Sequence, residues 1–283
     1  MYRAKNNGKS RHEIFDAQMH TRAVELLHLE TDLRLAVERN EFEVYYQPIV
    51  SLRTGLISGF EALVRWRHPR RGLLRPADFL RVAEETGLIL PMGIQVFRLA
   101  CQQMHEWHKR YPHLSHLQIS VNLSGKQFSQ PLMMNQIDQI LSETGLDAQA
   151  LTLEITEDTV IENSDAATAM IAHLRSRSVS LSLDDFGTGY SSLSYLHRFP
   201  THTLKIDRSF VSRIGSQGEN IEIVRTIVAL AHNLGMNVVA EGVETAHHLA
   251  YLRALACEYG QGFYFAPPMS SGEAEAFLRS FGG

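Results

Sequence analysis

Short runs rich in β-branched and aromatic residues alternate with segments of helical period along most of the chain. The runs at 42–51 (FEVYYQPIVS) and 56–66 (LISGFEALVRW) predict two strands joined by a turn at 53–55, and strands joined so tightly must be antiparallel. Six further strands are predicted at 118–123, 151–156, 179–184, 203–207, 237–241 and 262–265. Helices are predicted between most of them, at 76–86, 91–109, 131–144, 164–175, 191–198, 221–234, 245–256 and 272–280.

This alternation indicates an α/β fold with a mainly parallel sheet. Eight strands in a single domain of about 240 residues favour a closed TIM-like (β/α)8 barrel with an antiparallel first strand, and a doubly wound open sheet is the alternative. Ahead of the barrel, residues 17–40 predict an amphipathic helix. That helix either packs on the barrel or links it to an upstream domain, and the barrel domain is expected at 41–283.

Composition and charge narrow the possible partners. With 44% hydrophobic and 20% charged residues, the chain is typical of an ordinary globular protein. A net charge of −4 gives no general attraction to DNA or anionic lipid, so any recognition of phosphate must be local. No stretch approaches the ~20 apolar residues of a membrane span, and no secretory signal is evident. Cys101 and Cys257 are expected to be free, buried thiols in a reducing cytoplasm.

Polar side chains lie at or near the carboxyl ends of the predicted strands. Strands inside a barrel should be almost entirely apolar, and a buried charge costs several kcal/mol unless it is paired. For one strand alone, a satisfied core polar group is the better interpretation, but here six strands share the feature. The residues are Glu61, Asn122, Glu154, Asp184 with Asp185, Lys205 with Asp207, and Glu241.

These strand ends predict a metal centre. In a barrel they converge on the face that carries the catalytic groups. The adjacent carboxylates of Asp184 and Asp185 repel each other unless a cation lies between them. Oxygen ligands suit Mg²⁺ or Mn²⁺, and a bridging carboxylate would let two ions share the site. Taken alone, the segment 180–193 (SLSLDDFGTGYSSL) is also compatible with a solvated turn rich in Asp and Gly.

Eight short segments follow one another along the chain: QPI at 47–49, FEALVRW at 60–66, VNLS at 121–124, LEITE at 153–157, DDFGTGYSSL at 184–193, LKID at 204–207, AEGVE at 240–244 and GQGF at 260–263. With these segments in this order, the chain from about residue 31 to 281 resembles the EAL domain family, phosphodiesterases of the bacterial second messenger cyclic di-GMP. Residues 1–16 begin with MYRAKNNGKSR, which resembles the closing segment of a GGDEF domain, the diguanylate cyclase family. The naming motif of that family is absent, so the chain resembles a fragment of a longer GGDEF–EAL protein.

The resemblance implies two Mg²⁺ or Mn²⁺ ions, with Ca²⁺ inhibitory, and hydrolysis of cyclic di-GMP to linear pGpG. Lys205 is implied as a general base or an orienting charge beside the attacking water, with Glu61 and Glu241 also in the catalytic group. A lysine base needs a lowered pKa, which burial and neighbouring cations favour. The implied ligands are Glu61, Asn122, Glu154 and Asp184 for one ion, and Asp184, Asp185 and Glu241 for the other, with Glu241 binding directly or through water.

Further roles follow from the resemblance for substrate contacts. Arg65 is implied as a clamp on the phosphate oxygens, although it could instead be a surface arginine packed on Trp66. Gln261 is implied as a ligand or a water-holding contact, and Asp207 as a further substrate contact. The guanine specificity does not follow from any of these residues.

The segment 187–192 corresponds to the mobile loop of the family, which links metal occupancy to dimerisation. Gly187 and Gly189 belong to this loop, and Glu157 is implied as its anchor. Glu157 could also be a solvated acid at a helix start. A homodimer is therefore expected, together with an upstream GGDEF or sensor domain that could anchor the full-length protein to a membrane.

Three functions are compatible with these observations. The first is an active cyclic di-GMP phosphodiesterase, and the second is a catalytically silent receptor that binds the same dinucleotide and signals through its dimer. The third is a barrel phosphodiesterase of another substrate, which explains the acids but not the full set of motifs. Because the residues implied as ligands, the lysine and the loop glycines are all present, the first is favoured.

Overall fold

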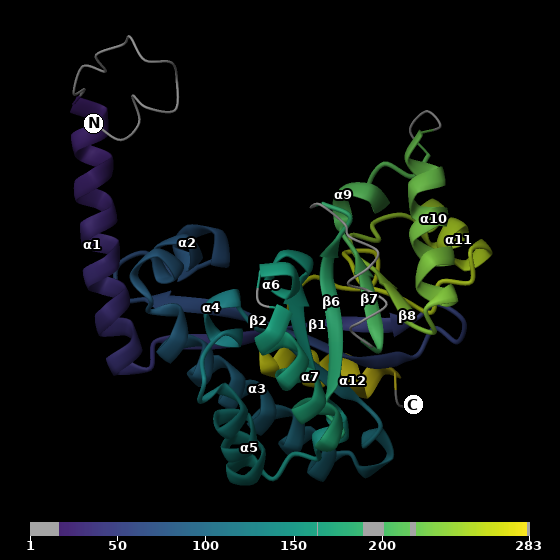
Figure 1. Cartoon of the computed structure of the whole chain (residues 1–283), viewed down its shortest axis with the longest axis horizontal. Coiled ribbons are helices and arrows are strands. Elements are labelled where there is room, and N and C mark those ends of the chain that lie inside the picture. Colours follow the sequence, from purple (N-terminus) through teal and green to yellow (C-terminus); the bar gives the residue numbers. More distant parts are fainter. Residues whose placement is uncertain (1–16, 163, 189–200, 216–218, 282–283) are drawn as a thin grey trace.

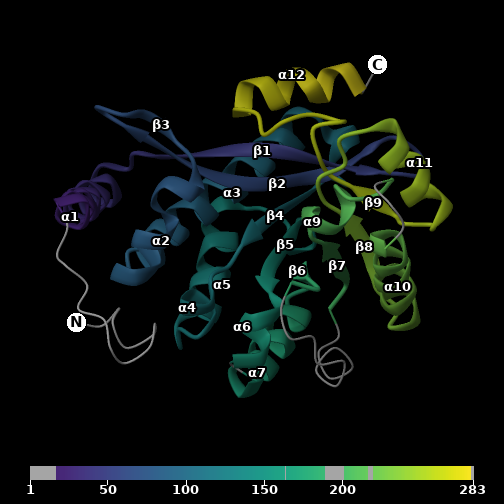
Figure 2. The same cartoon turned by 90° about the horizontal axis from the view of Figure 1, so that it is seen from above.

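Eight strands form a closed ring in the computed structural model, which describes residues 17–162, 164–188, 201–215 and 219–281 (Figures 1 and 2). A ninth, β3 (Gly72–Leu74), forms a hairpin with the end of β2 and was not predicted. The segment 1–16 and the helix predicted at 191–198 lie outside the described residues. The ring strands are β1 (Phe42–Ser51), β2 (Ile57–His68), β4 (Gln118–Asn122), β5 (Leu151–Thr156), β6 (Ser180–Phe186), β7 (Thr203–Ile206), β8 (Asn237–Ala240) and β9 (Tyr259–Gly260).

The strand order confirms a TIM-like barrel with an antiparallel first strand. Around the ring the order is β1-β9-β8-β7-β6-β5-β4-β2, and β2 pairs again with β1. β1 runs antiparallel to both of its neighbours, while all the other ring pairings are parallel. Because β1 joins β2 to β9, the sheet has no open edge in the ring, and the doubly wound open sheet is excluded.

Helices surround the ring and cover its outer face (Figure 2). Two of them end at a glycine: Gly87 and Gly145 adopt left-handed conformations that cap the C-termini of α2 and α5. The helices are α1 (Ala17–Arg39), α2 (Pro76–Thr86), α3 (Ile89–Arg110), α4 (Gly125–Phe128), α5 (Met133–Thr144), α6 (Glu157–Glu162), α7 (Ser164–Ser176), α9 (Arg208–Val211), α10 (Glu219–Asn233), α11 (Ala246–Ala254) and α12 (Ser271–Phe281).

Helix α1 packs against the rest of the chain through its second half. Leu33 and Ala36 are fully buried, whereas Leu27 is 62% exposed, and Figure 1 shows the helix beside α2 with its first turns extending beyond it. The carboxylate of Asp32 lies 3.1 Å from Nε2 of His68 at the end of β2 and accepts a hydrogen bond of 3.0 Å from Arg70. This half of α1 is therefore fixed to β2, and a role as a linker stays a prediction.

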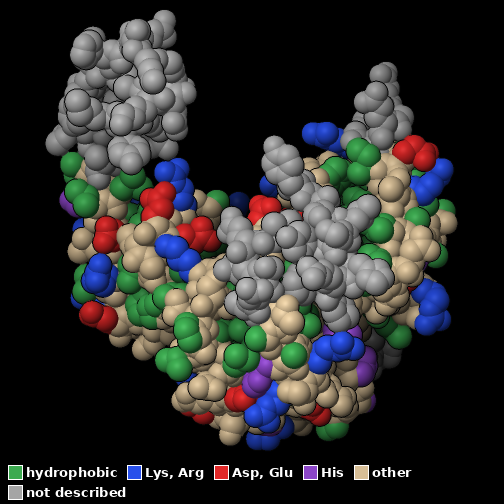
Figure 3. Space-filling view, viewed as in Figure 1, with side chains coloured by type: hydrophobic (Ala, Val, Ile, Leu, Met, Phe, Trp, Pro, Cys, Tyr) green, Lys and Arg blue, Asp and Glu red, His purple; other side chains and the backbone are tan. Residues whose placement is uncertain are grey.

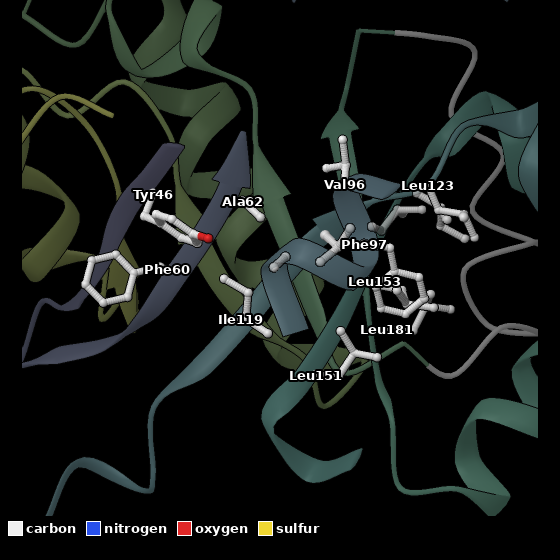
Figure 4. Close-up of a cluster of buried hydrophobic side chains, with 14 of the residues drawn as sticks. Tyr46, Phe60, Ala62, Val96, Phe97, Ile119, Leu123, Leu151, Leu153 and Leu181 are labelled. Carbon is white, nitrogen blue, oxygen red and sulfur yellow. The ribbon is translucent and has the colours of Figure 1, made fainter. Parts of the chain in front are cut away.

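The main hydrophobic core lies between the barrel and the helices. Successive side chains of a strand point to opposite faces, so Leu151, Leu153 and Ile155 of β5 face outward while Glu154 faces the interior. Aromatic rings fill the same outer layer, with those of Tyr46 and Trp107 at 4.8 Å in an edge-to-face arrangement. Figure 4 shows part of this cluster. The apolar residues of each strand thus hold the barrel together and leave the inward positions to polar side chains.

The prediction of a last strand at 262–265 is wrong. The last strand is β9 at Tyr259–Gly260, and the chain turns at once, with the backbone N–H of Phe265 donating to the carbonyl of Gly262. Gly262 has φ of 155°, and a Cβ there would lie 2.3 Å from the carbonyl oxygen of Val243. The close approach of two backbones, and not a strand, is what places glycine at this position.

Two simpler expectations can be compared with the structure. Cys101 and Cys257 are free and buried, as predicted. Among the helices of the described residues, none combines the length and the apolar character needed to cross a bilayer.

Charged side chains of both signs are interspersed on the face in Figure 3, where the described residues form no extended region of one sign.

Candidate active site

Lys205 lies at the centre of a ring of carboxylates inside the barrel. It is in β7, its side chain is buried, and its ammonium group contacts acids carried by four different segments. This convergence is the one predicted from the strand ends. The distances from Lys205 Nζ are 2.6 Å to Glu154 Oε2, 2.7 Å to Glu241 Oε1, 3.4 Å to Glu61 Oε2 and 3.4 Å to Asp184 Oδ1.

Glu61 is the most tightly fixed of these acids. Its Oε1 accepts a hydrogen bond of 2.7 Å from Asn122 Nδ2, and its Oε2 accepts one of 2.6 Å from Gln261 Nε2. Gln261 Nε2 also donates to Gln47 Oε1 at 3.0 Å. Sequence reasoning gave Gln47 no site role, although a lone amide in the apolar run VYYQPIV is a detectable signal. Two amides and a lysine therefore hold one carboxylate in place.

Asp184 and Asp185 reach the same side of β6 because the strand is irregular there. Consecutive strand residues normally point to opposite faces. Here the pairing with β7 shifts register between Leu183 and Phe186, and Asp185 has φ of 53°, in the left-handed region. Oxygens of Asp184, Asp185 and Glu241 consequently lie within 4.8 Å of one another. A non-glycine residue with positive φ is strained, and here the strain brings two acids into one cluster.

Burial and crowding raise the pKa values of the inner acids. Burial raises the pKa of Glu154 well above its usual range, since the attraction of Lys205 does not compensate and the nearby Glu61 adds to the rise. Burial likewise raises the pKa of Glu241 to about 7, and the pKa of Asp185 is raised by burial and by the adjacent Asp184. These carboxyl groups require more positive charge than a single lysine provides.

The pKa values of Glu61 and Lys205 are shifted in the directions that favour the charged forms of both side chains. Burial alone would raise the pKa of Glu61, but Lys205 and the hydrogen bonds from Gln261 and Asn122 bring it below the usual value. Burial alone would lower the pKa of Lys205, but the surrounding carboxylates, Glu154 first, raise it well above its usual range. The expectation of a lowered lysine pKa is therefore not met in this arrangement, because the anions outweigh desolvation.

The residues fit divalent cations well. Five acids, Glu61, Glu154, Asp184, Asp185 and Glu241, lie around one buried ammonium group, which leaves an excess of negative charge. Carboxylate and amide oxygens are the ligands that Mg²⁺ and Mn²⁺ prefer. The buried oxygen Oε1 of Gln261 has no hydrogen-bond partner among the described residues, which adds a further free oxygen beside the cluster.

Two of the predicted substrate contacts, Arg65 and Asp207, have other contacts of their own. Arg65 is on the same face of β2 as Glu61, and its guanidinium lies 5.2 Å from the ring centre of Tyr45, not on Trp66. Asp207 accepts a hydrogen bond of 2.9 Å from the backbone N–H of Ser209 and so caps α9. A substrate role for Arg65 and Asp207 stays a prediction.

The loop-anchoring residues are only partly described. Glu157, the first residue of α6, is 7% exposed, so the alternative of a solvated acid is wrong. Gly187 has φ of 92°, and a Cβ there would lie 3.1 Å from the ring of Phe210, which explains glycine at this position. Gly189 lies outside the described residues, so the anchoring role itself stays a prediction.

Comparison with known proteins decides the family. Residues 30–268 match the family model described as the EAL domain. The chain belongs to the EAL domain family. It is 40% identical over 281 residues to the cyclic di-GMP phosphodiesterase NbdA of Pseudomonas aeruginosa, which covers 99% of this chain and 36% of NbdA. It is 38% identical over 281 residues to the cyclic di-GMP phosphodiesterase PdeR of Escherichia coli, covering 99% and 42%. This EAL chain thus spans about two fifths of the length of these curated relatives.

Solved structures share the fold of this EAL domain. The PaMucR phosphodiesterase in complex with c-di-GMP aligns with a TM-score of 0.83 and 41% identity, covering 88% of this chain and 99% of that one. The FimX EAL domain from Pseudomonas aeruginosa bound to c-di-GMP aligns with a TM-score of 0.78 and 26% identity, covering 86% and 96%. The resemblance inferred from the eight sequence segments is confirmed at the level of family and fold.

Proposed function

We propose that this EAL domain hydrolyses cyclic di-GMP to linear pGpG and depends on divalent cations. The observation that carries the proposal is the gathering of Glu61, Glu154, Asp184 and Glu241 around Lys205 at one end of the barrel. Support also comes from the relatives named as cyclic di-GMP phosphodiesterases and from the aligned phosphodiesterase complex. Hydrolysis adds water across one phosphodiester bond, so the ring opens to a linear dinucleotide.

The cation ligands are proposed from the resemblance to the EAL family, and the clustering of the acids supports them. When bound, Mg²⁺ or Mn²⁺ would lower the pKa of a water molecule and neutralise charge on the phosphate. The first ion would be held by Glu61, Asn122, Glu154 and Asp184, and the second by Asp184, Asp185 and Glu241. Ca²⁺ is expected to inhibit.

Lys205 and the two glutamines have separate tasks in this proposal. Lys205 holds Glu154 and Glu241 toward the centre through contacts of 2.6 and 2.7 Å, and it is proposed as an orienting charge or a general base beside the attacking water. Gln261 and Gln47 fix the rotamer of Glu61 from the other side. The fixed acids lose little freedom on binding cations, and such preorganisation supports catalysis.

The exposed rim of the site supplies the contacts to substrate. Arg65 is half-buried above Glu61 on the same strand face, where a change of rotamer from Tyr45 would bring its guanidinium to a bound phosphate. Because the chain carries a net charge of −4, this local positive group matters more than any general attraction. Asp207 is proposed as a further contact at this rim.

Turnover of purified protein tests the proposal. With Mg²⁺ or Mn²⁺ the chain should convert cyclic di-GMP to pGpG, and a chelator or Ca²⁺ should stop it. Glu61→Ala should lower kcat at least about 100-fold, since a ligand is lost. The matched control is Glu222→Ala, whose side chain is 65% exposed on α10. Binding of cyclic di-GMP without turnover under any divalent ion would favour the receptor instead, and near-normal rates in Glu61→Ala would remove Glu61 from the site.

Two further proposals concern the oligomeric state of the chain and the full-length protein. We propose that this chain forms a homodimer and belongs to a longer protein in which a GGDEF domain or a sensor lies upstream of α1, facing the cytoplasm. The short share of the relatives' length that it spans is consistent with this. Sedimentation of the chain with and without Mn²⁺ measures the oligomeric state directly.

A further inference from the structure

The interior of the barrel beneath the carboxylates is built from unusually small residues. In TIM barrels, bulky branched side chains normally fill these inner layers. Here the positions two residues before Glu61 and before Lys205 are Gly59 and Thr203, and the position two before Asp184 is Ser182. Ser120 and Thr152 precede Asn122 and Glu154 in the same way. The barrel is therefore not closely packed below its charged layer.

A cavity of about 70 Å³ occupies this space. Its lining includes Glu154 at the upper end and hydroxyl residues from three neighbouring strands, Ser120, Thr152 and Ser182. It extends to the first residues of β7 and β8 at the opposite end of the strands. The cavity thus connects the carboxylate of a proposed metal ligand with polar groups on the side away from the substrate.

The hydroxyl group of Ser182 indicates that the cavity holds water. Ser182 is 1% exposed, and its Oγ has no hydrogen-bond partner among the described residues. Buried hydroxyl groups are nearly always hydrogen-bonded, to protein or to ordered water. A polar cavity needs at least ~10–15 Å³ of such volume to hold one water, so this one has room for more than one.

We propose that the cavity is a built water site, in which a small cluster of ordered waters joins Ser182 to the carboxylate of Glu154. Ser182 and Glu154 are register partners on β6 and β5, so both side chains enter the interior at the same level. Water between them gives Glu154 a hydrogen bond from below, in addition to the one that it accepts from Lys205 above. Ser182 is thereby a positioning residue for Glu154.

This role rests on the proposed function, because Glu154 is a proposed metal ligand there. Partners in the outer shell of a metal ligand typically change metal affinity or activity 10–100-fold when they are removed. Loss of the water cluster should remove the second hydrogen bond to Glu154, so that its carboxylate is held by Lys205 alone and is less well preorganised for a cation. The expected consequence is weaker binding of the metal, not of the dinucleotide.

The first test is structural and independent of activity. A crystal structure of the wild-type chain at about 1.8 Å or better should show ordered water within hydrogen-bond distance of Ser182 Oγ. A second crystal under xenon pressure distinguishes a wet cavity from a dry one, because dry apolar cavities take up xenon. A cavity without water, or one filled by xenon, would overturn the proposal.

The second test uses a matched pair of substitutions. Ser182→Val and Ser182→Thr introduce side chains of the same shape, but only the threonine keeps a hydroxyl group. The Ser182→Val variant should bind Mn²⁺ about tenfold more weakly, or weaker still, in calorimetry. The Mn²⁺ concentration for half-maximal turnover should rise by the same factor, while KM for cyclic di-GMP should stay nearly unaltered. Thr should recover most of the lost affinity. If Val binds Mn²⁺ as tightly as the wild type, Ser182 is not a positioning residue.

The design separates the two proposals and guards against misfolding. Should Ser182→Val fail to fold, Ser182→Ala removes the hydroxyl without added bulk, and it is expected to weaken Mn²⁺ binding in the same direction. Unchanged Mn²⁺ affinity in Ser182→Ala would then count against the positioning role. A wild-type chain that shows ordered water and binds Mn²⁺ without turnover would refute the proposed hydrolysis and leave the water site standing.

Discussion

Replacing Lys205 by Met tests whether the buried carboxylates depend on this one positive charge. Four acids lie within 3.4 Å of the ammonium group, and Lys205 is fully buried, so solvent cannot take its place. Removing one partner from a buried ion pair costs about 3–5 kcal/mol. At about 2–4 °C per kcal/mol for chains of roughly this size, Tm should fall by about 6–20 °C in the presence of a chelator.

Thermal unfolding at two pH values and with Mn²⁺ measures this effect. The control is Lys109→Met, on the exposed side of α3. Without Lys205, the folded-state pKa values of Glu154 and Glu241 rise further above their unfolded values. The destabilising effect of these two carboxyl groups is therefore absent at low pH and grows as pH rises. The fall in Tm caused by Lys205→Met should consequently be larger at pH 8 than at pH 5. Mn²⁺ should restore more stability to Lys205→Met than to the wild type. A fall in Tm no larger than that of Lys109→Met would refute the reasoning.

Two further predictions concern single carboxyl groups. The pKa of Glu241 is raised by burial from its usual 4.5 to about 7, so chelated wild-type protein should lose stability as pH rises from about 4.5 to about 7 and change little above that. Glu241→Gln should flatten that step in a Tm–pH profile. Hydrogen bonds from Arg279, Arg110 and Tyr111 lower the pKa of Glu275 to about 2, which stabilises the attachment of α12 above the unfolded pKa. Glu275→Gln should therefore be less stable than wild type at pH 7, and the difference should shrink in denaturant titrations as pH falls from about 4.5 toward 2; a gap that does not change with pH would contradict this.

Much of the barrel and of its charged centre could be predicted from the sequence, because both follow from local periodicity. A strand such as LTLEIT places Leu151 and Leu153 on one face and Glu154 on the other, and in a closed ring all inward faces meet. The residue types at the strand ends were therefore sufficient to predict that Glu61, Glu154 and Lys205 lie together, before any distance was known.

Other features depend on contacts between distant segments and were not predictable. The shift of register that turns Asp184 and Asp185 to one side arises from the pairing of β6 with β7. Gly262 was assigned to a strand, although its conformation follows from the approach of the backbone at Val243. The direction of the pKa shift of Lys205 also required the structure, since burial and the carboxylates act in opposite senses and only the distances decide between them.

The ring of strands closes at a narrow seam between β1 and β9, and β9 pairs with β8 through only two residue pairs as well. β1 and β9 pair through only two residue pairs, Val50 with Gly260 and Ser51 with Tyr259, whereas β1 and β2 pair along nearly their whole length. Gln261 follows the seam directly and donates a hydrogen bond to Glu61. The barrel consequently cannot close during synthesis before residues 259–261 have emerged from the ribosome, and the same step completes the hydrogen bonds to Glu61. A nascent chain that ends before residue 259 would carry every carboxylate of the site and still be unable to assemble it.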